Sequence, residues 1–168
     1  ISVIAAGLIV AYPVADTDLF WHLASGEWMV RAHSFLTSDP FSVSAYGSSW
    51  VNIHWLYQLI ALFVYSMSGF AGIVILKSLI VASTAFMLMS IRPADTKSML
   101  LRGAVIVSAI FFIRHQLADR PTLFTLLFIA LFINFFERYR TDGNKKWLFA
   151  LIPVQILWAN IQGLFLLG

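Results

Sequence analysis

Apolar residues form long continuous runs along this chain, and polar residues gather in the segments between them. Residues 70–91 and 122–136 are the clearest runs. They approach the roughly 20 apolar residues that cross the hydrocarbon core of a bilayer as a helix. The two-residue alternation expected of membrane strands is absent. The pattern therefore predicts an all-α, polytopic membrane protein.

We expect about five transmembrane helices and two helices at the membrane surface. Residues 53–91 would measure about 58 Å as one helix, nearly twice the hydrocarbon thickness, so we expect a break at Ser68–Gly69. The polar segment 16–52 is predicted to hold turns around an extended piece at 41–45. The predicted spans are residues 1–15, 70–91, 98–113, 121–137 and 147–168, and the surface helices are residues 19–32 and 53–67.

The first and last predicted spans are incomplete. Residues 1–15 rise only about 22 Å as a helix, short of the roughly 30 Å of hydrocarbon. The chain also stops inside the apolar run 164–167. We therefore expect it to be part of a longer polytopic protein.

Composition narrows the class of protein further. Hydrophobic residues make up 60% of the chain and charged residues 11%, which indicates an integral membrane protein with the lipid bilayer as its surroundings. The absence of cysteine excludes disulfides, thiolate metal sites and cysteine nucleophiles. Lys and Arg form no cluster interleaved with aromatic residues, so a nucleic-acid partner is not expected.

The distribution of Lys and Arg predicts the orientation. Seven of them fall in the loops after the second and fourth spans, and three fall in the other loops. The positive-inside rule places the seven in the cytoplasm. The 16–52 loop, the 114–120 loop and the Asn160–Gln162 segment are then expected to share the outer face. The seven are Arg92, Lys97, Arg102, Arg138, Arg140, Lys145 and Lys146, and the three are Arg31, Arg114 and Arg120.

Asp16 and Asp18 directly follow the first apolar run. Two carboxylates at this spacing can bind a divalent cation such as Mg²⁺ or Mn²⁺ together, or one can act as a general base that the other positions. Alternatively, either aspartate caps the helix that begins at residue 19.

Other polar groups are candidates for substrate binding. His22 and His54 could contact substrate or carry a proton, or could be amphipathic anchors at the interface. Arg120 could bind a phosphate bidentately, or could form a local ion pair with Asp119. Lys77, inside a predicted span, could face a cavity or pair with a neighbouring helix.

Two amides interrupt the last apolar run. Asn160 and Gln162 could hydrogen-bond a hydroxylated substrate. Equally, they could only tie neighbouring helices together, as amides do in bilayers.

Six motifs follow one another along the chain, namely DTDLFWHLASGEW at 16–28, SDPFS at 38–42, GSSW at 47–50, HWL at 54–56, RP at 120–121 and WANIQG at 158–163. Together they resemble the N-terminal third of bacterial GT-C membrane glycosyltransferases, in particular a branch with an acidic opening and a D-P-F-S turn. Gln162 stands where this resemblance predicts His.

The resemblance implies a first outer loop with two interfacial helices and an acidic pair. It also implies sugar transfer from a polyprenyl-phosphate donor at the outer, periplasmic face of the bacterial cytoplasmic membrane, without a nucleotide-sugar domain. Asp16 would be the base or metal ligand, Asp18 its partner, and Arg120 a contact to the donor phosphate. The alternative is a non-catalytic accessory subunit of a larger membrane complex. A transporter is the weaker reading, because intramembrane charge is sparse and no inverted repeat is visible.

Overall fold

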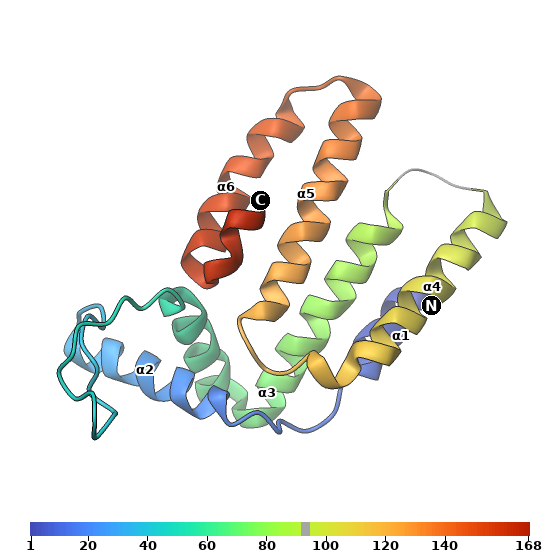
Figure 1. Ribbon diagram of the computed structural model, residues 1–168. Coiled ribbons are helices and arrows are strands. Elements are labelled where there is room, and N and C mark those ends of the chain that lie inside the picture. The colour runs from blue at the N-terminus through green and yellow to red at the C-terminus, as the bar shows by residue number, and fades with distance from the viewer. Residues whose placement is uncertain (92–94) are drawn as a thin grey trace.

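The computed structural model describes residues 1–91 and 95–168, and in this part of the chain all regular secondary structure is helical (Figure 1). The predicted all-α fold is confirmed. The one β-type pairing among the described residues is an isolated bridge between Ser38 and Ser49. The helices are α1 Ser2–Ile9, α2 Asp18–Ala32, α3 Trp55–Met89, α4 Thr96–Ile113, η1 Arg114–Gln116, α5 Thr122–Asp142, α6 Lys146–Ile161 and η2 Gly163–Leu167.

Within the described residues, three helical segments are long and apolar enough to cross a membrane, namely α3, α4 together with η1, and α5. Helix α6 is apolar but shorter. Large apolar side chains such as Phe63, Leu79 and Leu100 stay exposed on their surfaces. Exposed apolar side chains on helices with internally paired backbones suit a lipid environment. The chain thus has the architecture of a polytopic membrane protein.

Helix α3 breaks where the sequence predicts. Gly69 has φ 59° and ψ −148°, which is not helical, and it separates a first half from a second half. Glycine adopts this conformation because it has no Cβ. The break lets the first half of α3 turn away from the second half.

The first predicted span is shorter than expected. Helix α1 ends at Ile9 rather than continuing to residue 15. Pro13 disfavours helical backbone at the preceding residue. The Tyr12 hydroxyl donates a hydrogen bond to the Arg114 carbonyl over 2.6 Å, which holds the connection against the start of η1.

Two further expectations about local structure are wrong. The predicted fifth span, 147–168, is interrupted at Gln162, whose backbone is extended, and the chain continues as η2. Residues 41–45 are not extended either. The Asp39 carboxylate accepts hydrogen bonds from the amides of Phe41 (2.8 Å) and Ser42 (3.0 Å), which fold this segment into turns. Of the predicted 92–97 loop, residues 92–94 lie outside the described residues.

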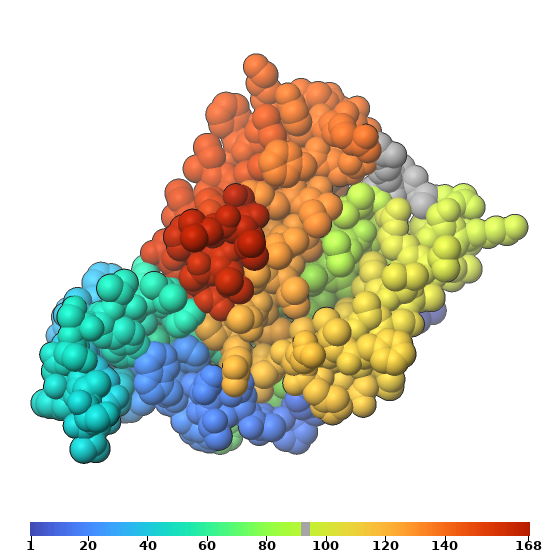
Figure 2. All heavy atoms as spheres, in the orientation of Figure 1, coloured from blue at the N-terminus to red at the C-terminus, as the bar shows by residue number. Residues whose placement is uncertain are grey.

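The connections gather at the two ends of the bundle as the charge pattern predicts. Helix α2, the α1–α2 connection and the α4–α5 connection lie at one end, and the α5–α6 connection lies at the other (Figure 1). Figure 2 shows α2 and the loop that follows it projecting from the first end. Arg120 therefore lies at the same end as Asp16, whereas Lys145 and Lys146 lie at the opposite end.

Helix α2 packs closely on the first half of α3. A Cβ added at Gly26 would lie 2.7 Å from the Gln58 carbonyl oxygen, so only glycine allows this approach. Leu19 and Leu23 are buried on the same side of α2. This packing fixes the helix that carries Asp18 and His22.

Candidate functional site

Arg120 joins both early aspartates. Its Nη2 lies 3.1 Å from Asp16 Oδ1 and 3.1 Å from Asp18 Oδ2, and its Nε donates a hydrogen bond to Asp16 Oδ2. The Asp16 side chain is 5% exposed, whereas those of Arg120 and Asp18 are 48% and 54% exposed. A buried carboxylate is therefore covered by a partly exposed guanidinium.

The backbone positions both partners of this pair. Asp16 Oδ1 accepts a hydrogen bond from the amide of Asp18 (3.0 Å), the first residue of α2, although the N-cap of this helix is Thr17. Arg120 lies between η1 and α5, in a turn closed by a hydrogen bond from its amide to the Ala118 carbonyl (2.8 Å). The Asp16 carboxylate thus accepts hydrogen bonds from both the Asp18 amide and Arg120.

The hydrogen bond from Arg120 lowers the pKa of Asp16 below its ordinary value. A carboxylate that is stabilised in its charged form is a good anionic acceptor but a weak proton acceptor. Asp16 therefore gains basicity only when Arg120 moves away from it.

Asp119 pairs with Lys77 and not with the neighbouring Arg120, so the alternative of a local ion pair between Asp119 and Arg120 is wrong. Its partner is Lys77 of α3, whose Nζ lies 3.2 Å from Asp119 Oδ1, with both side chains 1% exposed. Lys77 Nζ also lies 3.9 Å from the centroid of the Tyr12 ring. The Tyr57 hydroxyl donates to the Asp119 carbonyl over 2.6 Å. Lys77 is therefore paired, but with the connection between η1 and α5 rather than with a neighbouring helix.

Two hollows flank the Asp16–Arg120 pair. The first, called here the acidic pocket, has a volume of 360 Å³ and is lined by Tyr12, Ala15, Asp16, Thr17, His115, Ala118, Asp119 and Arg120. The second, called here the aromatic pocket, has a volume of 570 Å³ and is lined by Thr17, Asp18, Trp21, His22, Trp50, Val51, Asn52, Ile53 and His54. Thr17 borders both, so the two pockets are neighbours.

The two candidate histidines meet in the aromatic pocket. The ring centroids of His22 and His54 lie 5.6 Å apart, and the His22 ring also contacts that of Tyr57 at 4.9 Å. Burial, helped by nearby His54, lowers the pKa of His22 to about 4. Burial also lowers the pKa of His54, whose Nδ1 lies 3.3 Å from the Ile161 carbonyl oxygen. His22 is therefore neutral near pH 7 and can exchange hydrogen bonds with a ligand.

The two late amides lie outside both pockets. Asn160 Oδ1 accepts a hydrogen bond from Trp55 Nε1 (3.0 Å), which ties the end of α6 to the start of α3. Gln162 is buried, and its Oε1 accepts from the Gly163 amide (2.6 Å). Asn160 thus makes the contact between helices that was the alternative to substrate binding. Gln162 hydrogen-bonds to the residue that follows it.

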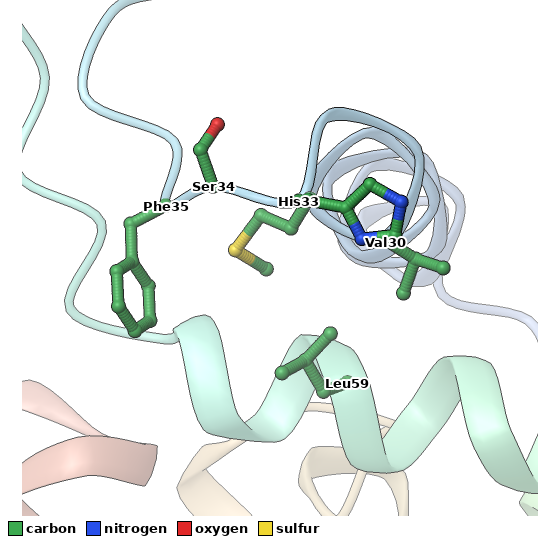
Figure 3. Close-up of a pocket in the computed structure, with 6 residues that line it drawn as sticks. Val30, His33, Ser34, Phe35 and Leu59 are labelled. Carbon is green, nitrogen blue, oxygen red and sulfur yellow. The ribbon is translucent and has the colours of Figure 1, made fainter.

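A third hollow lies at the other end of α2, between that helix and α3 (Figure 3). It has a volume of 380 Å³, and its lining includes Val30, His33, Phe35 and Leu59 but no acid. It contains none of the residues that the sequence predicts for the site. The candidate site residues that α2 carries, Asp18 and His22, lie near the N-terminal end of this helix.

The aspartates do not form a ready cation site. Among residues 1–91 and 95–168, no group of three or more His, Cys, Asp or Glu side chains is placed to hold a metal ion. Arg120 already supplies the positive charge that Asp16 and Asp18 share. Mg²⁺ or Mn²⁺ would fit between these carboxylates only after the guanidinium moved.

Sequence reasoning missed several residues that line the pockets. Trp50 and Asn52 come from the long polar loop, where the sequence carries no periodicity to orient them. The sequence indicates Asp119 only as a possible ion-pair partner of Arg120. An aromatic residue in an otherwise polar loop was the one available signal for Trp50.

Comparison of the chain with protein-family models, curated proteins and solved structures finds no match.

Proposed function

We propose that this chain is part of a membrane-embedded glycosyltransferase of the GT-C type. It would transfer a sugar from a polyprenyl-phosphate donor to an acceptor hydroxyl at the outer face of the bacterial cytoplasmic membrane. The observation that carries the proposal is the buried Asp16 carboxylate held by Arg120 between two adjacent pockets. The motif resemblance supplies the reaction class.

Arg120 is the contact for the donor phosphate in this proposal. Its guanidinium is half exposed and presents parallel N–H donors. This geometry allows two parallel hydrogen bonds to one phosphate. A phosphate would compete with Asp16 for these donors. Since the Arg120 hydrogen bond is what holds the pKa of Asp16 down, losing it would raise the basicity of Asp16. Donor binding would thereby activate the base.

The proposed reaction is an inverting displacement. The acceptor oxygen forms a bond to the anomeric carbon of the sugar, and the bond from that carbon to the phosphate oxygen breaks. The polyprenyl phosphate leaves with the electron pair, stabilised by Arg120. Asp16 takes the proton of the acceptor hydroxyl, and Asp18 holds the displaced guanidinium through its existing contact.

A divalent cation is a second source of positive charge. Mg²⁺ or Mn²⁺ would be bound by Asp16 and Asp18 and would neutralise the leaving phosphate. In the free protein Arg120 already places a positive charge beside Asp16 and Asp18, so we propose that the arginine rather than a cation neutralises the phosphate. Turnover that survives EDTA supports this choice, and turnover that needs added Mg²⁺ or Mn²⁺ supports the cation.

The test is a transfer assay with the full-length protein in proteoliposomes that contain polyprenyl-phosphate-linked sugars. Asp16→Asn should abolish transfer, because the amide cannot accept the proton. Glu27→Gln is the matched control: Glu27 lies in α2, the helix that follows Asp16, and its ion pair is with exposed Arg31. Unchanged turnover in Asp16→Asn would refute the assignment.

The second candidate is an accessory membrane subunit that binds lipid or other subunits without catalysis. The observation that favours it is structural: the Asp16–Arg120 pair and the Asn160–Trp55 bond both join distant parts of the chain. Exchanging the charges in Asp16→Arg/Arg120→Asp tests it. A wild type that transfers sugar, together with a folded exchanged variant that does not, favours the enzyme, whereas a wild type and a folded exchanged variant that both lack transfer favour the subunit.

A further inference from the structure

We propose that the aromatic pocket is a binding subsite for a neutral pyranose ring, with Trp21 and Trp50 as its platform and His22 as a hydroxyl partner. This inference rests on the proposed function and deepens it. It places the sugar in the aromatic pocket and leaves the phosphate to Arg120 on the acidic side.

The tryptophans supply the platform. Trp21 comes from α2 and Trp50 from the long loop, and their ring centroids lie 4.7 Å apart at 47°. Trp21 is 38% exposed although it is a large aromatic residue in a structured helix. The face of an aromatic ring carries negative charge density, which attracts the polarised C–H groups on one face of a sugar ring. Two tilted indoles that line one hollow suit such a ring.

His22 lines the pocket and has an unsatisfied polar atom. The residue is 5% exposed, and its Nδ1 has no hydrogen-bond partner in the described part of the chain. A buried polar atom without a partner carries a free-energy penalty that a ligand hydroxyl can remove. Neutral imidazole can donate from one nitrogen and accept at the other, as a sugar hydroxyl requires.

The wall that carries Trp50 is fixed in place. Asn52 Nδ2 donates to Gln58 Oε1 (2.7 Å), and Gln58 Nε2 donates back to Asn52 Oδ1 (3.0 Å). Gln58 is completely buried in α3. This reciprocal amide pair attaches the loop to α3, so the pocket is largely formed before a ligand binds.

The charges around the pocket favour an uncharged sugar. No Lys or Arg is among the described residues that line it, and Asp18 is its one charged lining residue. A sugar carboxylate would meet Asp18 without a free cation, because the nearby Arg120 already contacts both aspartates. A neutral hexose avoids this repulsion and can use Asp18 as an acceptor for a hydroxyl.

The test is saturation-transfer NMR on the full-length protein in nanodiscs. The probes are the methyl glycosides of glucose, mannose and galactose, with methyl glucuronide as the acidic counterpart. At least one neutral glycoside should bind saturably, and the glucuronide should bind at least about tenfold more weakly, the factor that 1.4 kcal/mol represents.

Variants locate the binding. Trp21→Leu and His22→Ala should each weaken the Kd about tenfold, whereas Trp21→Phe should keep most of the affinity. Trp147→Leu is the matched control, since Trp147 lies at the opposite end of the bundle. Trp21 is partly exposed, so its replacement leaves the fold intact even if Trp50→Leu does not fold.

The outcomes separate this inference from the proposed function. Asp16→Asn should still bind the glycoside while losing transfer. Absence of saturable binding by every neutral glycoside, equal binding of the glucuronide, or wild-type affinity in Trp21→Leu each overturns the subsite. Glycoside binding that depends on Trp21 in a protein without transferase activity keeps the subsite and rejects the enzyme.

Discussion

Asp16 and Arg120 lie 104 residues apart in the sequence and form an ion pair at one end of the bundle. The pair brings the connection before α2 against the connection before α5. It also leaves a half-exposed guanidinium over a buried carboxylate. Any anion that binds Arg120 at this position therefore acts directly on the charge state of Asp16.

Removing Arg120 should change the acid stability of the protein. The pKa of Asp16 is lowered by Arg120, so the pair stabilises the fold above the ordinary Asp pKa of about 3.9 and loses this contribution as pH falls through the lower folded value. Arg120→Gln should cost about 1 kcal/mol near pH 7, a value reduced by the exposure of Arg120, and should flatten the Tm profile below pH 4. Arg31→Gln, which breaks an exposed pair, should leave the profile unchanged.

His22 should produce a separate acid transition at higher pH. The folded pKa of about 4 lies below the ordinary value of 6.5, so the unfolded chain binds more protons between these values. Stability should therefore fall by about 3 kcal/mol as pH drops from 6.5 to 4. His22→Phe should remove most of this slope in Tm, and His33→Gln, at the exposed end of α2, should keep it. An unaltered slope in His22→Phe would contradict the prediction.

The Lys77–Asp119 pair should be costly to break from one side only. Lys77→Met leaves a buried Asp119 carboxylate without its cation and should destabilise the fold by about 3–5 kcal/mol. The double variant Lys77→Met/Asp119→Leu removes both charges and should recover much of that loss. Thermal unfolding in detergent measures both. A single variant as stable as the wild type would show that the pair is not coupled.

Gly69 should tolerate no other residue. Its φ of 59° with ψ of −148° lies in a region open essentially to glycine alone, so Gly69→Asn should cost about 1–3 kcal/mol. Gly143 has φ 66° and ψ 4° at the end of α5, a left-handed conformation that Asn accepts. Gly143→Asn should therefore leave Tm nearly unchanged. Equal effects at the two positions would contradict the reading of α3 as two helices.

The sequence predicts features that depend on local chemistry and length. The break at Gly69 follows because residues 53–91 are too long for one span. The grouping of Asp16 with Arg120 follows from counting charges by loop. Helix α2 follows from its aromatic and apolar positions. Each of these depends on residues close together in the chain or on a rule that applies to whole loops.

The sequence does not predict features that depend on distant partners. The connection after α1 is held by a hydrogen bond from Tyr12 to the Arg114 carbonyl, a contact between distant residues that no local pattern encodes. The partner of Lys77 is Asp119, 42 residues away, and a charge in a span does not identify its counter-ion. Asn160 makes its contact with Trp55, 105 residues away, so its structural use could not be separated from a binding role.

Thr17 borders both pockets, and only this short residue lies between Asp16 and Asp18 in the chain. A molecule that occupies both hollows at once would have to pass this residue. A longer side chain at position 17 would hinder such a molecule and leave the other lining residues of each hollow unchanged.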